Sequence, residues 1–92
     1  METASYLFTL PKWWNWELEL TPHLLKRMDD RDFNEADLTG MFHRGKNHKK
    51  DVVEGRWVIE SEHKRHPWEI IVEPDAIEKL LVVVTAYPVW DG

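Results

Sequence analysis

Apolar and polar residues alternate with a period of two in the segment WWNWELEL, which begins at Trp13. A period of two is typical of a β-strand that has one buried face. We therefore predict a first strand from Trp14 to Leu20, with its apolar side on the core. The apolar side carries Trp14, Trp16, Leu18 and Leu20, and the polar side carries Asn15, Glu17 and Glu19.

Two short amphipathic helices are predicted after this strand. Thr21 is a favourable N-cap with Pro22 at the first helical position, and this helix should end near Asp32. Asn34 and Asp37 form a capping-box pattern for a second helix that Gly45 ends. The apolar stripes are Leu24, Leu25 and Met28 in the first helix, and Leu38, Met41 and Phe42 in the second.

Three strand-like runs follow a basic segment, GKNHKKD, at residues 45–51. That segment has no apolar anchor, so we expect a mobile, solvent-facing loop. The runs cover residues 56–63, 67–74 and 79–89, with connections of hairpin length. The predicted order is strand, helix, helix, strand, strand, strand. This order indicates an α+β fold with two helices packed on a four-stranded antiparallel sheet, in a single domain of residues 1–92 with residues 1–12 as an N-terminal extension.

The phase of each run separates a core face of the sheet from an open face. Glu69, Ile71 and Glu73 should lie on the open face, because Trp68, Ile70 and Val72 are the more apolar set. By the same reasoning Trp57 and Ile59 point to the core, opposite Arg56, Val58 and Glu60. A β-bulge would invert such an assignment. In the last run we group Leu80, Val82, Val84 and Ala86 against Leu81, Val83, Thr85 and Tyr87, and we expect Leu24, Met28, Leu38, Phe42, Ile70, Val82 and Val84 to be buried.

Composition limits the functional classes. The 92 residues include no cysteine, which excludes disulfides, thiolate chemistry and cysteine-bearing zinc sites. No apolar run approaches the roughly 20 residues of a membrane span, and no signal peptide is evident, so we expect a soluble cytoplasmic protein without membrane contact. The net charge of −5 argues against non-specific adhesion to nucleic acid, so any RNA contact needs a local patch. Six tryptophans exceed what so small a core holds, which suggests that some line a cleft or a partner surface.

The first predicted helix carries candidate chemistry. His23, Arg27 and Arg31 follow one another at intervals of four, which places them along one side of a helix. A histidine in the first helical turn is disfavoured as the cation, so His23 could serve as a general base, and arginine forks match phosphate oxygens. On spacing alone, a solvated helix face paired with Asp29, Asp30 and Asp32 is the favoured interpretation.

Histidines elsewhere raise the possibility of a metal site. His43 and His48 lie five apart, and HKRH contains His63 and His66. Interleaved lysines and arginines oppose a bound cation, and no compact ligand motif is present, so we expect no metal and no cofactor. A basic rim is the better interpretation of these segments, and it comprises Lys46, Lys49, Lys50, Lys64 and Arg65.

Three stretches carry a family resemblance: HLLKRMDDRDF, EGRWVIESEHKRHPWEIIVEPD and LLVVVTAYPV. They resemble an uncharacterised bacterial family with H-x-x-x-R-M in its first helix and a closing V-V-T-x-Y strand, over roughly residues 16–89. That family is similar in topology to RelE and ParE toxins and to the wider barnase, EndoU, colicin and RelE group of ribonuclease folds.

This resemblance implies a metal-independent endoribonuclease toxin of a toxin–antitoxin pair, which cuts RNA through attack of the 2′-hydroxyl on the adjacent phosphate. The catalytic set implied is His23, Arg27, Thr85 and Tyr87, facing one cleft. Arg31, Arg56, Lys64 and Arg65 are the expected nucleic-acid contacts, of which Arg56 rests on strand phase. The alternative is a non-enzymatic protein-binding module of the same fold, including ParE-like inhibition of a protein target. The acidic balance favours this alternative.

Overall fold

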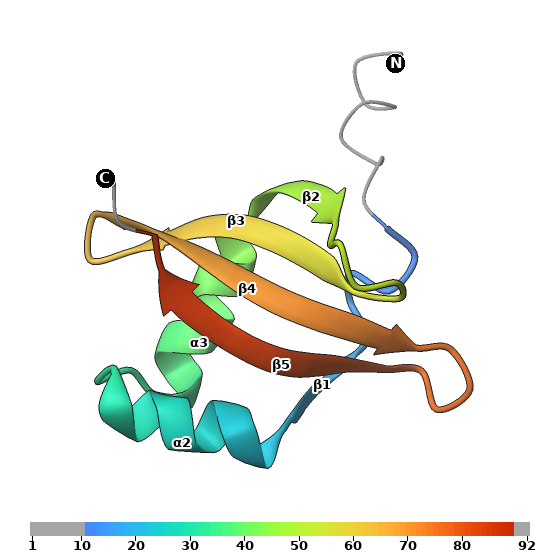
Figure 1. Cartoon of the computed structure of the whole chain (residues 1–92), viewed down its shortest axis with the longest axis horizontal. Helices are drawn as coiled ribbons and strands as arrows, with labels where there is room; N and C mark the ends of the chain where they lie inside the picture. Colours follow the sequence, from blue (N-terminus) through green and yellow to red (C-terminus); the bar gives the residue numbers. More distant parts are fainter. Residues whose placement is uncertain (1–10, 90–92) are drawn as a thin grey trace.

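A computed structural model of the chain describes residues 11–89 and has the predicted α+β architecture. Two helices lie against one mixed sheet whose strand order is β1-β5-β4-β3-β2 (Figure 1). Residues 1–10 of the expected N-terminal extension lie outside the described residues. The elements are β1 Glu17–Leu20, α2 Pro22–Asp30, α3 Glu35–His43, β2 Lys46–Lys50, β3 Trp57–His63, β4 His66–Asp75 and β5 Leu80–Pro88.

Within the described residues the sheet has five strands, so the prediction of four was wrong. The extra strand is β2, in the segment that we expected to be a mobile loop. It pairs antiparallel with β3 from Lys46, opposite Glu60, to Lys50, opposite Trp57. Its sequence gives no alternating signal, because only His48 turns partly inward while the other four residues of KNHKK are exposed. A lysine-rich strand is typical of a sheet edge, where charge discourages pairing with other chains.

The first strand also differs from the prediction. β1 begins at Glu17, not at Trp14, and it pairs with β5 in parallel, from Glu17 opposite Leu80 to Leu20 opposite Val83. Residues 11–16 form turns, with the Trp16 amide donating to the Trp13 carbonyl at 3.1 Å. Trp13 packs against Trp14 and Trp57 instead of continuing the strand. Burial of the indoles therefore overrides the alternating pattern.

A bulge in β5 changes the predicted faces of that strand. Thr85 pairs with Ile71 and Val83 pairs with Val72, which leaves Val84 as an additional residue. Leu81 and Val83 are consequently fully buried on the core side, whereas Val82 and Val84 are only half-buried. The prediction that Val82 and Val84 are core residues was wrong. Beyond the bulge the predicted phase is restored, since Ala86 is buried.

Both helices begin at their predicted caps. The Thr21 hydroxyl accepts a hydrogen bond from the Leu24 amide at 3.1 Å, and Asn34 and Asp37 form the reciprocal capping box. Each helix has nine residues, and α2 contacts β5 while α3 contacts β3 (Figure 1). Within the described part of the chain, no helix has the length and apolarity needed to cross a membrane. The expected burial is confirmed for Leu24, Met28, Leu38, Phe42 and Ile70.

Thr21 fastens α2 to the bulge, so its replacement should be costly. Its hydroxyl lies 3.2 Å from the Val83 carbonyl oxygen and 3.1 Å from that of Val84. We expect Thr21→Ala to lower the free energy of unfolding by about 1–3 kcal/mol, because a cap and a part-buried hydrogen bond are lost. Thr21→Ser retains the hydroxyl and should lose less than half as much. Urea unfolding of the two variants checks this, and equal losses would contradict a role for the hydroxyl.

Candidate functional site

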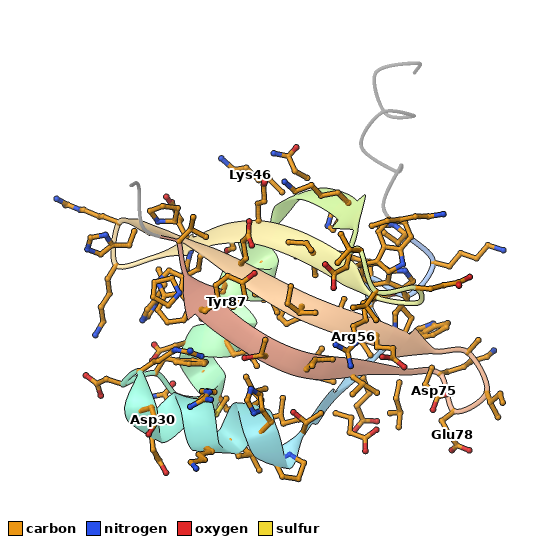
Figure 2. The ribbon with its side chains drawn as sticks, in the orientation of Figure 1. Asp30, Lys46, Arg56, Asp75, Glu78 and Tyr87 are labelled. Atoms are coloured by element: carbon orange, nitrogen blue, oxygen red, sulfur yellow. The ribbon has the colours of Figure 1, made fainter. Side chains whose placement is uncertain are left out.

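The sheet face that the helices leave uncovered carries a row of polar side chains. Tyr87 of β5 lies opposite Glu69 of β4, and Glu69 lies opposite Glu60 of β3. Lys49 of the edge strand β2 completes the row through its ion pair with Glu60. Tyr87 and Arg56 stand on the side of the sheet turned to the viewer in Figure 2, while α3 passes behind the strands. Four strands thus contribute to one surface.

Tyr87 and Glu69 form a short hydrogen bond in this row. The Tyr87 hydroxyl donates to Glu69 Oε1 at 2.7 Å in a partly buried setting. Burial, followed by this hydrogen bond and the negative charge of Glu69, raises the pKa of Tyr87 to about 12. Tyr87 is therefore protonated at neutral pH and supplies a proton donor, while the carboxylate supplies the acceptor.

Glu60 is held by two donors from β2. Lys49 Nζ lies 2.6 Å from Glu60 Oε2, and Asn47 Nδ2 donates to Glu60 Oε1 at 2.9 Å. These hydrogen bonds lower the pKa of Glu60 and, through the same contact, the pKa of Lys49 is raised. Glu60 is consequently ionised, and both of its carboxylate oxygens already have a partner on β2. Glu69 is the carboxylate of the row that accepts the hydrogen bond of the tyrosine hydroxyl.

A hollow of about 340 Å³ lies beside the polar row, toward the end of the sheet where β2 begins. Arg44 is fixed at its margin by Nε and Nη2, which donate to the Glu62 carbonyl at 3.1 and 3.0 Å. Together with Lys46, this guanidinium places positive charge next to Glu69. Among the residues that line the hollow are Arg44, Lys46, Asn47, Glu60 and Glu69.

The structure brings together only part of the predicted catalytic set. Thr85 and Tyr87 share the uncovered face, as their register with Ile71 and Glu69 shows. His23 and Arg27 belong to α2, which packs on the other side of the sheet. His23 is exposed, and Arg27 pairs with Asp30 at 3.0 Å. The helix pair and the strand pair thus do not form one cleft in this structure.

The predicted nucleic-acid contacts divide between two surfaces. Arg56 lies on the uncovered face and is paired with Glu73, with Nε 3.1 Å from the carboxylate. Arg31 and Lys64, distant in sequence, line one hollow between the end of α2 and the β3–β4 turn. Arg65 is exposed in the same turn and is not part of that lining.

The histidines considered as metal ligands are dispersed. Across residues 11–89, no group of three or more histidine, aspartate or glutamate side chains is placed to hold a metal ion. His48 packs against Trp13 and Trp14, with ring centroids 6.1 and 4.6 Å apart, and burial lowers its pKa. Two of the six tryptophans thus pack around the neutral imidazole of His48.

Several residues of the polar row were not in the predicted site. Glu60 and Glu69 were predicted to lie on the open face but were not assigned to the catalytic set, and Arg44 and Asn47 were not singled out. Register in the hairpin of β3 and β4 was the signal that could have found the carboxylates, because it aligns Glu60 with Glu69. Arg44 and Asn47 carry no such signal, because Asn47 lies in the unpredicted strand β2 and Arg44 is held by the Glu62 carbonyl of β3, which is distant in the sequence.

Comparison with known proteins adds no relative to this description: no family model, curated protein or solved structure matches the chain.

The pairing of Tyr87 with Glu69 predicts an unusual titration. Because the other tyrosine in the sequence is Tyr6, a Tyr6→Phe background isolates Tyr87. Its phenolate absorbance should appear near pH 12, and Glu69→Gln should move it toward 10 by removing the charge. The raised pKa stabilises the folded state fully below pH 10, and this contribution is lost as the pH rises from 10 to about 12. A midpoint near 10 in the background protein would contradict the hydrogen bond.

Proposed function

We propose that the uncovered face of the sheet cleaves RNA without a metal ion, as an endoribonuclease toxin controlled by an antitoxin in the bacterial cytoplasm. The observation that carries this proposal is the hydrogen bond of 2.7 Å between Tyr87 and Glu69. It joins a proton acceptor, Glu69, to a proton donor, and Glu69 lines the same hollow as Arg44 and Lys46. Metal-independent cleavage of RNA requires these three functions: a base, an acid and cations.

The two residues account for both proton transfers. Glu69 accepts the proton of the 2′-hydroxyl as the 2′-oxygen attacks phosphorus. The bond to the 5′-oxygen breaks, and that oxygen takes the proton of Tyr87. The proton on Glu69 then passes along the hydrogen bond to the Tyr87 phenolate, which returns both residues to their starting state. The products are a 2′,3′-cyclic phosphate and a free 5′-hydroxyl.

Positive charge for the phosphate comes from the lysines of β2 and from Arg44, which caps the C-terminus of α3. Lys46, Lys49 and Lys50 follow the exposed edge, and Arg44 is fixed at the margin of the hollow. Lys49 is partly neutralised by Glu60, so Arg44 and Lys46 are the cations that we assign to the reacting phosphate. Such a local stripe can recruit RNA although the whole chain is acidic.

The toxin assignment rests on the resemblance to RelE- and ParE-like proteins. The fold is compatible with it, since two helices lie on one side of the sheet and the opposite side is open. The proposal differs from the family-based expectation in its base, because Glu69 replaces His23 as the partner of Tyr87. Thr85 remains a neighbour of the site on the same strand face.

Substitution of Glu69 tests the proposal against a closely matched control. Glu69→Gln should reduce cleavage of a model RNA by about 10²- to 10⁴-fold, because the amide cannot accept the 2′-hydroxyl proton. Tyr87→Phe should reduce it by about 10²-fold or more. Glu73→Gln makes the same chemical change on the same strand face, where the carboxylate pairs with Arg56, and should retain activity.

His23→Ala distinguishes the two assignments of the base. It should stay folded and keep its activity if Glu69 is the base, and lose activity if the family-based assignment holds. Circular dichroism of every variant provides the folding control. Absence of cleavage by the wild-type protein, purified free of any partner, would overturn the enzymatic proposal.

A protein-binding module is the second candidate, and the exposed edge of β2 favours it. Among residues 11–89 this strand pairs only with β3, and its lysines match an acidic extended segment of a partner. If cleavage is absent, binding of an acidic peptide that Lys49→Glu and Lys50→Glu together abolish would support this second function.

A further inference from the structure

A second hollow, of about 310 Å³, opens on the other side of the same end of the sheet. It lies between the C-terminal end of α2 and the turn that joins β3 to β4. The walls carry cationic and aromatic side chains and expose little other polar surface. Its lining includes Arg31, Asp32, His63, Lys64, Trp68 and Pro88.

His63 is the first indication that this hollow receives a ligand. Its side chain is only 8% exposed, and its ring packs edge-on against Trp68 with centroids 5.5 Å apart. The Nε2 atom is buried and has no hydrogen-bond partner within the described residues. A buried polar atom without a hydrogen-bond partner destabilises the fold, so a ligand that hydrogen-bonds Nε2 would remove this penalty.

Arg31 is the second indication. Its Nη1 donates to the Ala86 carbonyl at 3.1 Å, on the part of β5 that β1 leaves unpaired. This bond orients the guanidinium at the hollow, and no carboxylate among residues 11–89 forms an ion pair with it. A guanidinium fixed in this manner is suited to phosphate oxygens, which it can bind with two parallel donors.

The turn between β3 and β4 is the third indication. Lys64 and Arg65 have φ angles of 52° and 68°, in the left-handed region. A two-residue hairpin turn of this kind favours Asn-Gly, because other side chains are strained in the left-handed region of the backbone. Two cationic residues thus occupy the strained positions of this turn, and one of them, Lys64, lines the hollow.

We propose that this hollow binds a nucleoside monophosphate. Arg31 and Lys64 hold the phosphate, the base lies against the apolar edge formed by Trp68 and Pro88, and His63 Nε2 hydrogen-bonds the nucleoside. Asp32 contributes one negative charge, so two cations leave the hollow with a net attraction for the anion. The volume matches the lower end of the range for small-molecule sites. This binding does not depend on cleavage at the opposite face.

Calorimetric titration of the full chain tests the proposal with three probes: adenosine 5′-monophosphate, adenosine and inorganic phosphate. Adenosine 5′-monophosphate should bind at least about tenfold more tightly than either fragment, because only it engages both parts of the hollow. Equal affinity for inorganic phosphate would overturn the nucleoside part of the proposal. Equal affinity for adenosine would overturn the phosphate part.

The turn supplies a matched pair of variants. Lys64→Asn and Arg65→Asn each remove one positive charge from adjacent positions, and asparagine tolerates the left-handed backbone of both. Lys64→Asn should weaken binding of adenosine 5′-monophosphate by about tenfold, whereas Arg65→Asn should change it by less than about twofold. Equal weakening would indicate general charge attraction and would overturn the assigned site.

His63→Leu provides an independent measurement. Removal of the unpaired Nε2 should leave the urea unfolding midpoint of the free protein unchanged or raise it, and should weaken nucleotide binding several-fold. Unchanged binding by a folded His63→Leu protein would contradict the contact with the nucleoside. Because every readout is binding or unfolding, an inactive protein that still binds the nucleotide would refute only the ribonuclease proposal.

Discussion

The bulge at Val84 is the constraint on which the rest of the arrangement depends. By adding one residue to β5, it allows Leu81 and Val83 to pack under the helices while Thr85 and Tyr87 reach the opposite face. Thr21 stabilises the bulge by contacting the carbonyls of residues 83 and 84 at the point where β1 ends and α2 begins. One hydroxyl therefore links the end of the parallel pairing, the start of a helix and the reversal of strand phase.

The parallel pairing with β1 covers only the first half of β5, so the second half pairs with β4 on one side, and α2 packs against the strand. Arg31 donates a hydrogen bond to the Ala86 carbonyl there, so a side chain satisfies a backbone acceptor of β5 that no strand pairing with β1 reaches. Both hollows then open at the same end of the sheet, one on each face, and Trp68 contributes to both linings.

Charge is distributed in a way that total composition conceals. The chain has a net charge of −5, yet β2 carries three lysines and the β3–β4 turn carries two further cations. Several carboxylates are used locally, since Glu60 pairs with Lys49 and Glu73 pairs with Arg56. Phosphate recognition in either hollow would use the few cations held in place by backbone carbonyls, such as Arg31 and Arg44.

The sequence by itself determined the local structure: both helix caps, the three long strands and the phases of β3 and β4, because these depend on neighbours within a few residues. Only the tertiary structure decided the parallel place of β1, the strand β2 and the bulge in β5. Pairing partners far along the chain set these features, and no local period encodes them. For the same reason, sequence spacing placed His23 beside Arg27 but could not predict the hydrogen bond between Tyr87 and Glu69, whose alignment depends on the bulge and on strand register.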